Sequence, residues 1–131
     1  HVRWTYDPLR AANAGLNIAR LGAEARTYYP DYYGDMAGIN HGAPSDRLLA
    51  DWHLASPQVA ARAAGQAAPP LAGPTLRIGI PADFGALLAG DPVAAQAERL
   101  RVRGEMQEAF AKGYAVRGFD TARREYLLLR D

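Results

Sequence analysis

The sequence opens with HVRWTYDPLRAANAGLNIARLGAEARTYYPDYYGDM over residues 1–36, the stretch with the strongest structural signal in the chain. Apolar and polar residues alternate before Asp7, which predicts a strand with one buried face. Asp7 is a good helix N-cap residue, Pro8 suits the first helical position, and Gly22 is placed to end the helix. A second strand is expected over residues 23–29. The stretch therefore predicts a strand, a helix and another strand.

The predicted helix spans residues 8–21 and carries two stripes at helical spacing. One stripe is apolar, with spacings of three and four residues, and is expected to face the core. The other is polar, with members at i, i+4 and i+7, and is expected to share one adjacent face. The apolar stripe is Leu9, Ala12, Leu16, Ala19 and Ala23, and the polar stripe is Asn13, Asn17 and Arg20.

A tyrosine cluster follows the second strand, because Tyr28, Tyr29, Tyr32 and Tyr33 fall within six residues. Tyrosine has an apolar body and a polar tip, so two interpretations stay open. The tyrosines form either a strand edge that packs on the sheet or the wall of a ligand pocket.

The rest of the chain alternates between the same two kinds of signal. Apolar alternation predicts strands, and Asp or Ser before proline predicts helix starts. The long helix is expected to bury Val93, Ala97, Leu100, Val102, Met106, Ala109 and Phe110. Strands are predicted over residues 47–54, 76–80, 114–119 and 125–129, and helices over residues 57–64, 82–88 and 92–112.

This order of elements predicts a mixed α/β fold whose sheet contains both parallel and antiparallel pairs. Pro69, Pro70, Gly73 and Pro74 make residues 66–74 a linker by composition. We therefore divide the chain into a first part over residues 1–65, the linker over 66–74, and a C-terminal α/β part over 75–131 that completes the fold.

Composition excludes several classes of function. The 131 residues suffice for one domain with a core, and the net charge of +1 provides no field that would recruit nucleic acid or an anionic membrane. The absence of cysteine removes disulfides, thiolate metal sites and cysteine nucleophiles, and fits a cytoplasmic protein. No apolar run approaches the roughly 20 residues of a membrane span. Arg99, Arg101 and Arg103 are expected on a solvated helix face, diluted by glutamates.

Catalytic motifs are equally scarce. His1, His41 and His53 have no metal-ligand spacing, so we expect no metal. Ser45 and Ser56 lie outside any GxSxG motif and suit capping instead. Glycines spaced by four after residue 33 are not followed by GK[ST], so they form no phosphate loop. The carboxylates considered for acid–base work are Asp46, Asp51 and Glu24, and spacing alone nominates none of them.

The stretch from Val2 to Tyr33 resembles the second half of the GNAT superfamily, the acyl-CoA-dependent N-acyltransferases. In that family a strand leads into a helix with small residues and asparagine, the helix ends in Leu-Gly, and a further strand follows. The motifs that carry the resemblance are WTYDPL, NAGLNIARLGA, YYGDM and GAPSDRLLADW, which resemble the bacterial subgroup of predicted acetyltransferases. The resemblance implies a GNAT-like mixed sheet flanked by helices.

The same resemblance implies an acyl-CoA co-substrate, acetyl-CoA or succinyl-CoA, and a small-molecule amine, such as an amino acid, as acceptor. Asn13, Asn17 and Arg20 would contact the cofactor. The acceptor pocket would comprise Tyr29, Tyr32, Tyr33, Arg47 and Trp52. The sequence departs from the family pattern at two positions. Ile18 occupies the position of the tyrosine that serves as the acid in the family, and Asn13 matches the family asparagine only loosely. The catalytic residues therefore stay unassigned.

The family's glycine-rich pyrophosphate loop is not found in these 131 residues, so we expect it before His1, in a longer protein whose N-terminal cofactor half is absent here. Two hypotheses stay open. The chain is either part of an N-acyltransferase that is inactive alone, or a non-catalytic binding or dimerisation module derived from the same fold. A strand edge left unpaired would favour association, a homodimer among the alternatives.

Overall fold

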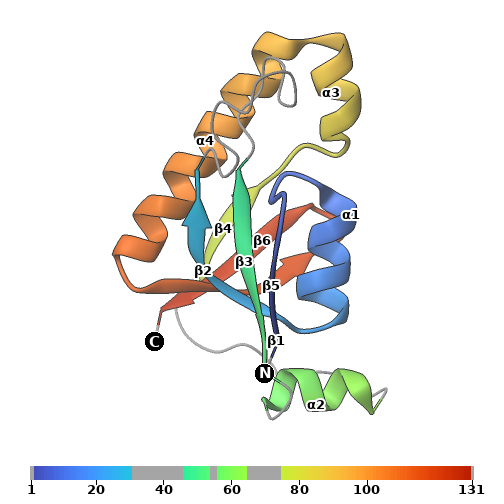
Figure 1. Cartoon of the computed structure of the whole chain (residues 1–131), viewed down its shortest axis with the longest axis vertical. Coiled ribbons are helices and arrows are strands. Elements are labelled where there is room, and N and C mark those ends of the chain that lie inside the picture. The colour runs from blue at the N-terminus through green and yellow to red at the C-terminus, as the bar shows by residue number, and fades with distance from the viewer. Residues whose placement is uncertain (1, 31–45, 54–55, 65–74, 131) are drawn as a thin grey trace.

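The protein is described here from a computed structural model, which covers residues 2–30, 46–53, 56–64 and 75–130. The order of helices and strands predicted from the sequence is confirmed, and most boundaries agree within two residues (Figure 1). The elements are β1 (Val2–Tyr6), α1 (Ala11–Ala14), the π-helix η1 (Gly15–Arg20), β2 (Glu24–Tyr29), β3 (Arg47–Trp52), α2 (Pro57–Ala63), β4 (Thr75–Gly79), α3 (Phe84–Gly90), α4 (Pro92–Ala111), β5 (Tyr114–Asp120) and β6 (Glu125–Arg130).

The strands form one six-stranded sheet in the order β1-β3-β2-β5-β6-β4. The predicted mixed α+β class is confirmed, but the expectation of parallel pairs is wrong, because every pair among the described strands is antiparallel. The reason is the position of one strand in each half. β1 and β2 run in the same direction, as a helical crossover requires, but β3 lies between them. In the same way β6 lies between β4 and β5.

The two halves of the sheet thus repeat one plan, a strand, a helical crossover, a second strand and a third strand inserted between the first two. They meet where Ala25 of β2 pairs with Val116 of β5. The segments on both sides of the proposed linker therefore contribute to one sheet, while residues 65–74 themselves lie outside the described residues.

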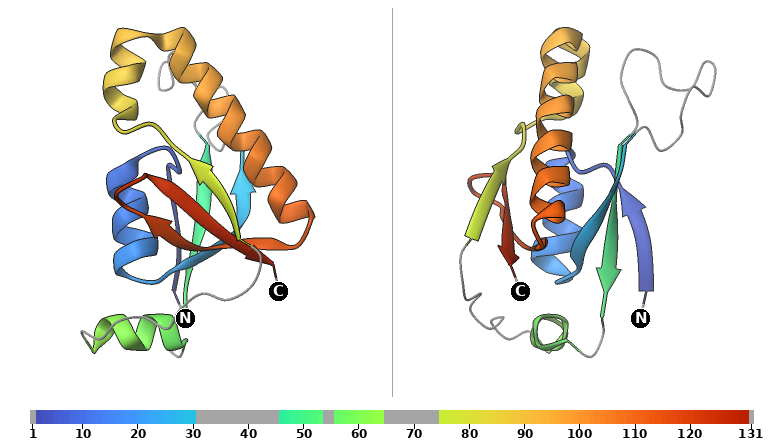
Figure 2. Two further views of the ribbon diagram at one scale, coloured as in Figure 1. Left: turned by 180° about the vertical axis from the view of Figure 1, so that it is seen from behind. Right: turned by 90° about the vertical axis from the view of Figure 1, so that its left-hand side faces the viewer.

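The sheet curves, so that α4 and the α1–η1 helix lie in its hollow (Figure 2). α4 contacts β2, β4 and β5 from this side, and η1 contacts β5. Val102, Met106 and Ala109 of α4 are buried there as predicted. Val93, Ala97 and Leu100 were expected to be buried but are exposed, because the helix turns this side toward solvent.

The first helix departs most from its prediction. Asp7 Oδ1 accepts a hydrogen bond from the Leu9 backbone N–H at 3.0 Å, which makes a turn of Pro8 and Leu9, so the helix begins at Ala11. The second half is a π-helix, in which the Leu21 N–H donates to the Leu16 carbonyl five residues earlier. The wider turn changes which residues face the core.

The spacing of the buried residues reflects the wider turn of the π-helix. The predicted stripe at spacings of three and four is wrong, because Ala12 is exposed and Leu16 is 46% exposed. Four buried apolar residues instead recur at spacings of five, four and five. They are Leu9, Ala14, Ile18 and Ala23.

Gly22 ends the helix in the left-handed conformation, with φ of 76°. We expect Gly22→Ala to lower the free energy of unfolding by about 1–2 kcal/mol, because a Cβ atom is strained at this φ. Gly104, inside α4, is the matched control, since a Cβ there would meet nothing within 4 Å. Gly104→Ala should raise the free energy of unfolding by up to about 1 kcal/mol. Urea denaturation measures both, and changes of the same sign would contradict the prediction.

Candidate functional site

The three residues expected to contact a cofactor do not share one face. Asn13 and Arg20 are exposed, but Asn17 is only 5% exposed. Its side-chain oxygen accepts a hydrogen bond from Trp4 Nε1 at 3.0 Å. The prediction of a common face is therefore wrong, and the cause is again the π-helix, which turns Asn17 toward β1.

The residues expected in the acceptor pocket fall into two places. Tyr29 and Arg47 are register partners at the ends of β2 and β3. Arg47 donates from Nε to Thr5 Oγ1 at 3.2 Å and from Nη2 to the Thr5 carbonyl at 2.7 Å. Trp52 lies at the other end of β3, about 17 Å away at the usual strand rise. Tyr32 and Tyr33 lie outside the described residues.

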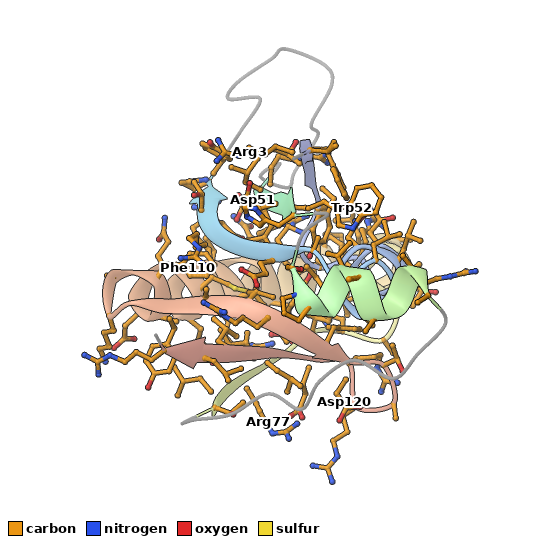
Figure 3. All side chains as sticks on the ribbon, turned by 90° about the horizontal axis from the view of Figure 1, so that it is seen from below. Arg3, Asp51, Trp52, Arg77, Phe110 and Asp120 are labelled. Atoms are coloured by element: carbon orange, nitrogen blue, oxygen red, sulfur yellow. The ribbon has the colours of Figure 1, made fainter. Side chains whose placement is uncertain are left out.

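Trp52 is brought together with Arg20, which the sequence had placed in a different site. Both line a pocket of about 190 Å³ between the end of η1 and α2. The pocket lies at the end of the molecule from which Figure 3 is viewed, beside α2. Its lining residues are Arg20, Leu21, Trp52, Val59 and Ala63.

Hydrogen bonds and ring contacts hold the tryptophan wall of this pocket in place. Trp52 Nε1 donates to the Leu21 carbonyl at 3.0 Å. The Trp52 ring meets the Trp4 ring edge-on, with centroids 6.2 Å apart, and Trp4 is bonded to Asn17. The chain of contacts from Asn17 through Trp4 to Trp52 fixes the wall before any ligand arrives, which lowers the cost of ordering it on binding.

A second feature is a cluster of buried charges between α4 and the neighbouring ends of β1, β2 and β3. Arg99, only 3% exposed, binds both carboxylate oxygens of Asp7 and lies over the Phe84 ring at 4.6 Å. Arg103 binds both oxygens of the fully buried Asp46, at 2.9 and 2.7 Å. The prediction that Arg99 and Arg103 belong to a solvated helix face is wrong.

Buried tyrosines complete this cluster. Tyr28 donates to Asp46 Oδ2 at 2.7 Å, and Tyr126 donates to the Pro8 carbonyl at 2.7 Å. Because the single proton of Tyr126 goes to that carbonyl, Tyr6 is the donor in the 3.1 Å contact between the two hydroxyls. Burial raises the pKa of all three tyrosines above the ordinary value, and for Tyr28 the bond to Asp46 and its charge raise the pKa further.

The sequence carried only a weak signal for these ion pairs. Asp7 has the pattern of a helix cap, yet its partner lies 92 residues away. The spacing of Arg99 and Arg103 by four residues on one face was the available hint, because two arginines one turn apart can reach residues next to two different strands, here Asp7 after β1 and Asp46 before β3. Such a long-range choice of partners depends on the tertiary fold.

The three carboxylates considered for acid–base work are all ion-paired. Asp46 is held by Arg103, Asp51 by Arg3 at 2.6 Å, and Glu24 by arginines at 3.3 and 3.7 Å. Arg3 and Asp51 lie on the outer face of the sheet, away from the helices (Figure 3). Ile18, at the position of the expected acid, is fully buried.

Metal-ligating residues do not gather in the described part of the chain, where no three of His, Cys, Asp and Glu are placed to hold an ion. Of the histidines, only His53 lies within the described residues. None of the described helices has the length and apolar character that crossing a membrane requires.

Comparisons with protein-family models, with curated proteins and with solved structures found no significant match. The features that bear on function are therefore the chain's own: the pocket at Arg20 and Trp52, the buried charges at Asp7 and Asp46, and the exposed Asn13 in the helix that follows β1.

Proposed function

We propose that this chain is part of a cytoplasmic N-acyltransferase of the GNAT type, which moves an acetyl or succinyl group from acyl-CoA to the amine of a small molecule. The observation that carries the proposal is the unit β1, helix, Leu21-Gly22 and β2, which has the order of elements that the resemblance implies. It is supported by the position of β1, which has a strand partner on one side only among the described residues.

An edge strand suits this reaction for a physical reason. Among the described strands none pairs with its outer N–H and C=O groups, so these groups can bond the amides of an extended pantetheine arm. Asn13 is exposed in the helix that follows β1, and its amide offers both a donor and an acceptor. Asn17 has its oxygen bonded to Trp4, and Arg20 lies at the far end of the helix. Asn13 is therefore the proposed cofactor contact among the three.

The reaction is a direct transfer. The acceptor nitrogen attacks the thioester carbonyl, the new C–N bond forms, and the C–S bond breaks to release CoA thiolate. A base takes the proton from the nitrogen, and an acid returns one to sulfur. Backbone N–H groups near the thioester stabilise the oxyanion. No described residue is nominated for the acid or the base, because Ile18 is buried and the three candidate carboxylates are ion-paired.

The lack of a catalytic acid or base among the described residues favours the second candidate, a non-catalytic binding or dimerisation module derived from the GNAT fold. The two candidates differ in one measurement, amine-dependent release of CoA by the gene product that carries this sequence. Acetyl-CoA and succinyl-CoA serve as donors, and a set of amino acids and small amines as acceptors. Release with any pair supports the acyltransferase, and its absence with every pair supports the module.

Asn13→Ala is expected to lower kcat/KM for acyl transfer by about tenfold, since one amide pair to the cofactor is worth about 1–1.5 kcal/mol. Gln96→Ala is the matched control, because Gln96 is also an exposed amide on a helix. Its kcat/KM should stay at the wild-type value. Circular dichroism confirms that both variants are folded. An Asn13→Ala enzyme with wild-type kinetics would remove Asn13 from the cofactor site.

A further inference from the structure

We infer that the pocket between η1 and α2 is a binding site for a small carboxylate with a compact apolar body, such as an aryl or branched aliphatic acid. The inference does not depend on acyl transfer, since it uses none of the groups proposed to hold acyl-CoA. It rests on an arginine that has no partner among the described residues, an aromatic wall held in place by contacts, and an apolar lining.

The charge comes from Arg20. Its guanidinium makes no hydrogen bond or ion pair with the described residues, whereas Arg3, Arg99, Arg101 and Arg103 are each paired with a carboxylate. A guanidinium presents two parallel N–H donors, which match a carboxylate in geometry and charge. An anion that enters the pocket therefore finds a cation that no described carboxylate neutralises.

The apolar body has a matching surface. Val59, at 2% exposed, forms the floor, and the Trp52 ring forms a wall that is held by Leu21 and Trp4. The pocket volume of about 190 Å³ corresponds to roughly six water molecules at about 30 Å³ each. That volume accommodates one ring or one branched chain and is too small for a nucleotide or a long acyl chain.

One effect opposes an anion here, because the C-terminal end of a helix carries a partial negative charge. That charge is about half a unit at most and falls off within one turn. The Leu21 carbonyl is also already bonded to Trp52 Nε1 at 3.0 Å. The full positive charge of Arg20 is the larger of the two, so the pocket favours an anion overall.

Intrinsic fluorescence provides the test, because both tryptophans of the chain belong to the wall or contact it. The probes are phenylacetate, its neutral analogue phenylacetamide, and inorganic phosphate. Phenylacetate should change the emission saturably and bind at least about tenfold more tightly than either of the others, since only phenylacetate has both the charge and the apolar body.

Two variants and a control locate the site. Arg20→Gln should weaken phenylacetate binding by about tenfold or more, and Ala63→Leu, which fills the pocket without changing its charge, should also weaken it. Arg123→Gln should have no effect, because Arg123 is an exposed arginine in the β5–β6 turn. The inference is overturned if no probe saturates, if phenylacetamide or phosphate binds as tightly as phenylacetate, or if Arg20→Gln binds like wild type.

Discussion

The protein is expected to unfold over a narrow range of pH above 10. Tyr6, Tyr28 and Tyr126 are three of the seven tyrosines, and burial raises the pKa of each in the folded state. In the unfolded chain these hydroxyls ionise near the ordinary pKa of about 10. Below that pH both states keep the protons, so the three tyrosines add no pH dependence.

Above pH 10 the unfolded state loses protons that the folded state retains, so stability falls as the pH rises. Each tyrosine contributes about 1.4 kcal/mol per pH unit, and three contribute about 4 kcal/mol per unit. Against an ordinary stability of about 5–15 kcal/mol, the transition is complete within a few pH units.

Circular dichroism and tyrosinate absorbance measured together test this expectation. A fraction of the tyrosines should ionise only as the fold is lost. Tyr28→Phe should reduce the slope of unfolding free energy against pH by about one third, although it also removes a hydrogen bond at every pH. If all seven tyrosines ionise together near pH 10 while the fold persists, the buried tyrosine cluster is wrong.

Asp46→Ala is expected to lower the free energy of unfolding by about 3–5 kcal/mol, because it removes the buried carboxylate that binds the mostly buried Arg103 guanidinium. Asp46 is fully buried, accepts two bonds from Arg103 and one from Tyr28, and ties the start of β3 to the middle of α4. Removing its carboxylate leaves the Tyr28 hydroxyl without this acceptor as well.

Asp51→Ala is the matched control. Asp51 also binds an arginine, at 2.6 Å, but Arg3 is 60% exposed on the outer face of the sheet, where an ion pair contributes at most about 1 kcal/mol. Urea denaturation of both variants gives the comparison. The double variant Asp46→Leu with Arg103→Met should recover part of the loss, because it removes both charges together. Equal decreases in the free energy of unfolding for Asp46→Ala and Asp51→Ala would contradict the distinction between the buried and the exposed ion pair.

Local signals in the sequence predicted the elements well, because their causes are local. Ser56 and Asp91 precede prolines, and their side chains accept bonds from the backbone of Val59 and Ala94 as a cap requires. The alternation that predicted a strand over residues 47–54 agrees with the burial in β3, since Leu48 and Ala50, two residues apart, are both fully buried.

Two features depended on the tertiary fold and could not be predicted from these local signals. A π-helix and an α-helix have similar residue preferences, so the spacing of Leu9, Ala14, Ile18 and Ala23 was apparent only afterwards. The insertion of β3 between β1 and β2 is a choice of strand neighbour, which no periodicity specifies.

The sequence identified some residues of the candidate site, but it did not predict which of them lie together. Arg20 and Trp52 were both named, but as parts of different sites, because the two are far apart in the sequence and the side of the helix that carries Arg20 depends on the π-turn. Asn17 was named as a cofactor contact, whereas the structure has its oxygen bonded to Trp4.

The central claim is that acyl-CoA meets this chain along β1 and at Asn13. The most direct test is titration of the isotope-labelled gene product that carries this sequence with acetyl-CoA, followed by amide chemical shifts in NMR. We expect shifts for Asn13 and the residues of β1, with the amides of α4 unchanged, and the same pattern with CoA itself. An absence of shifts up to millimolar acetyl-CoA, or shifts confined to other elements, would contradict the claim.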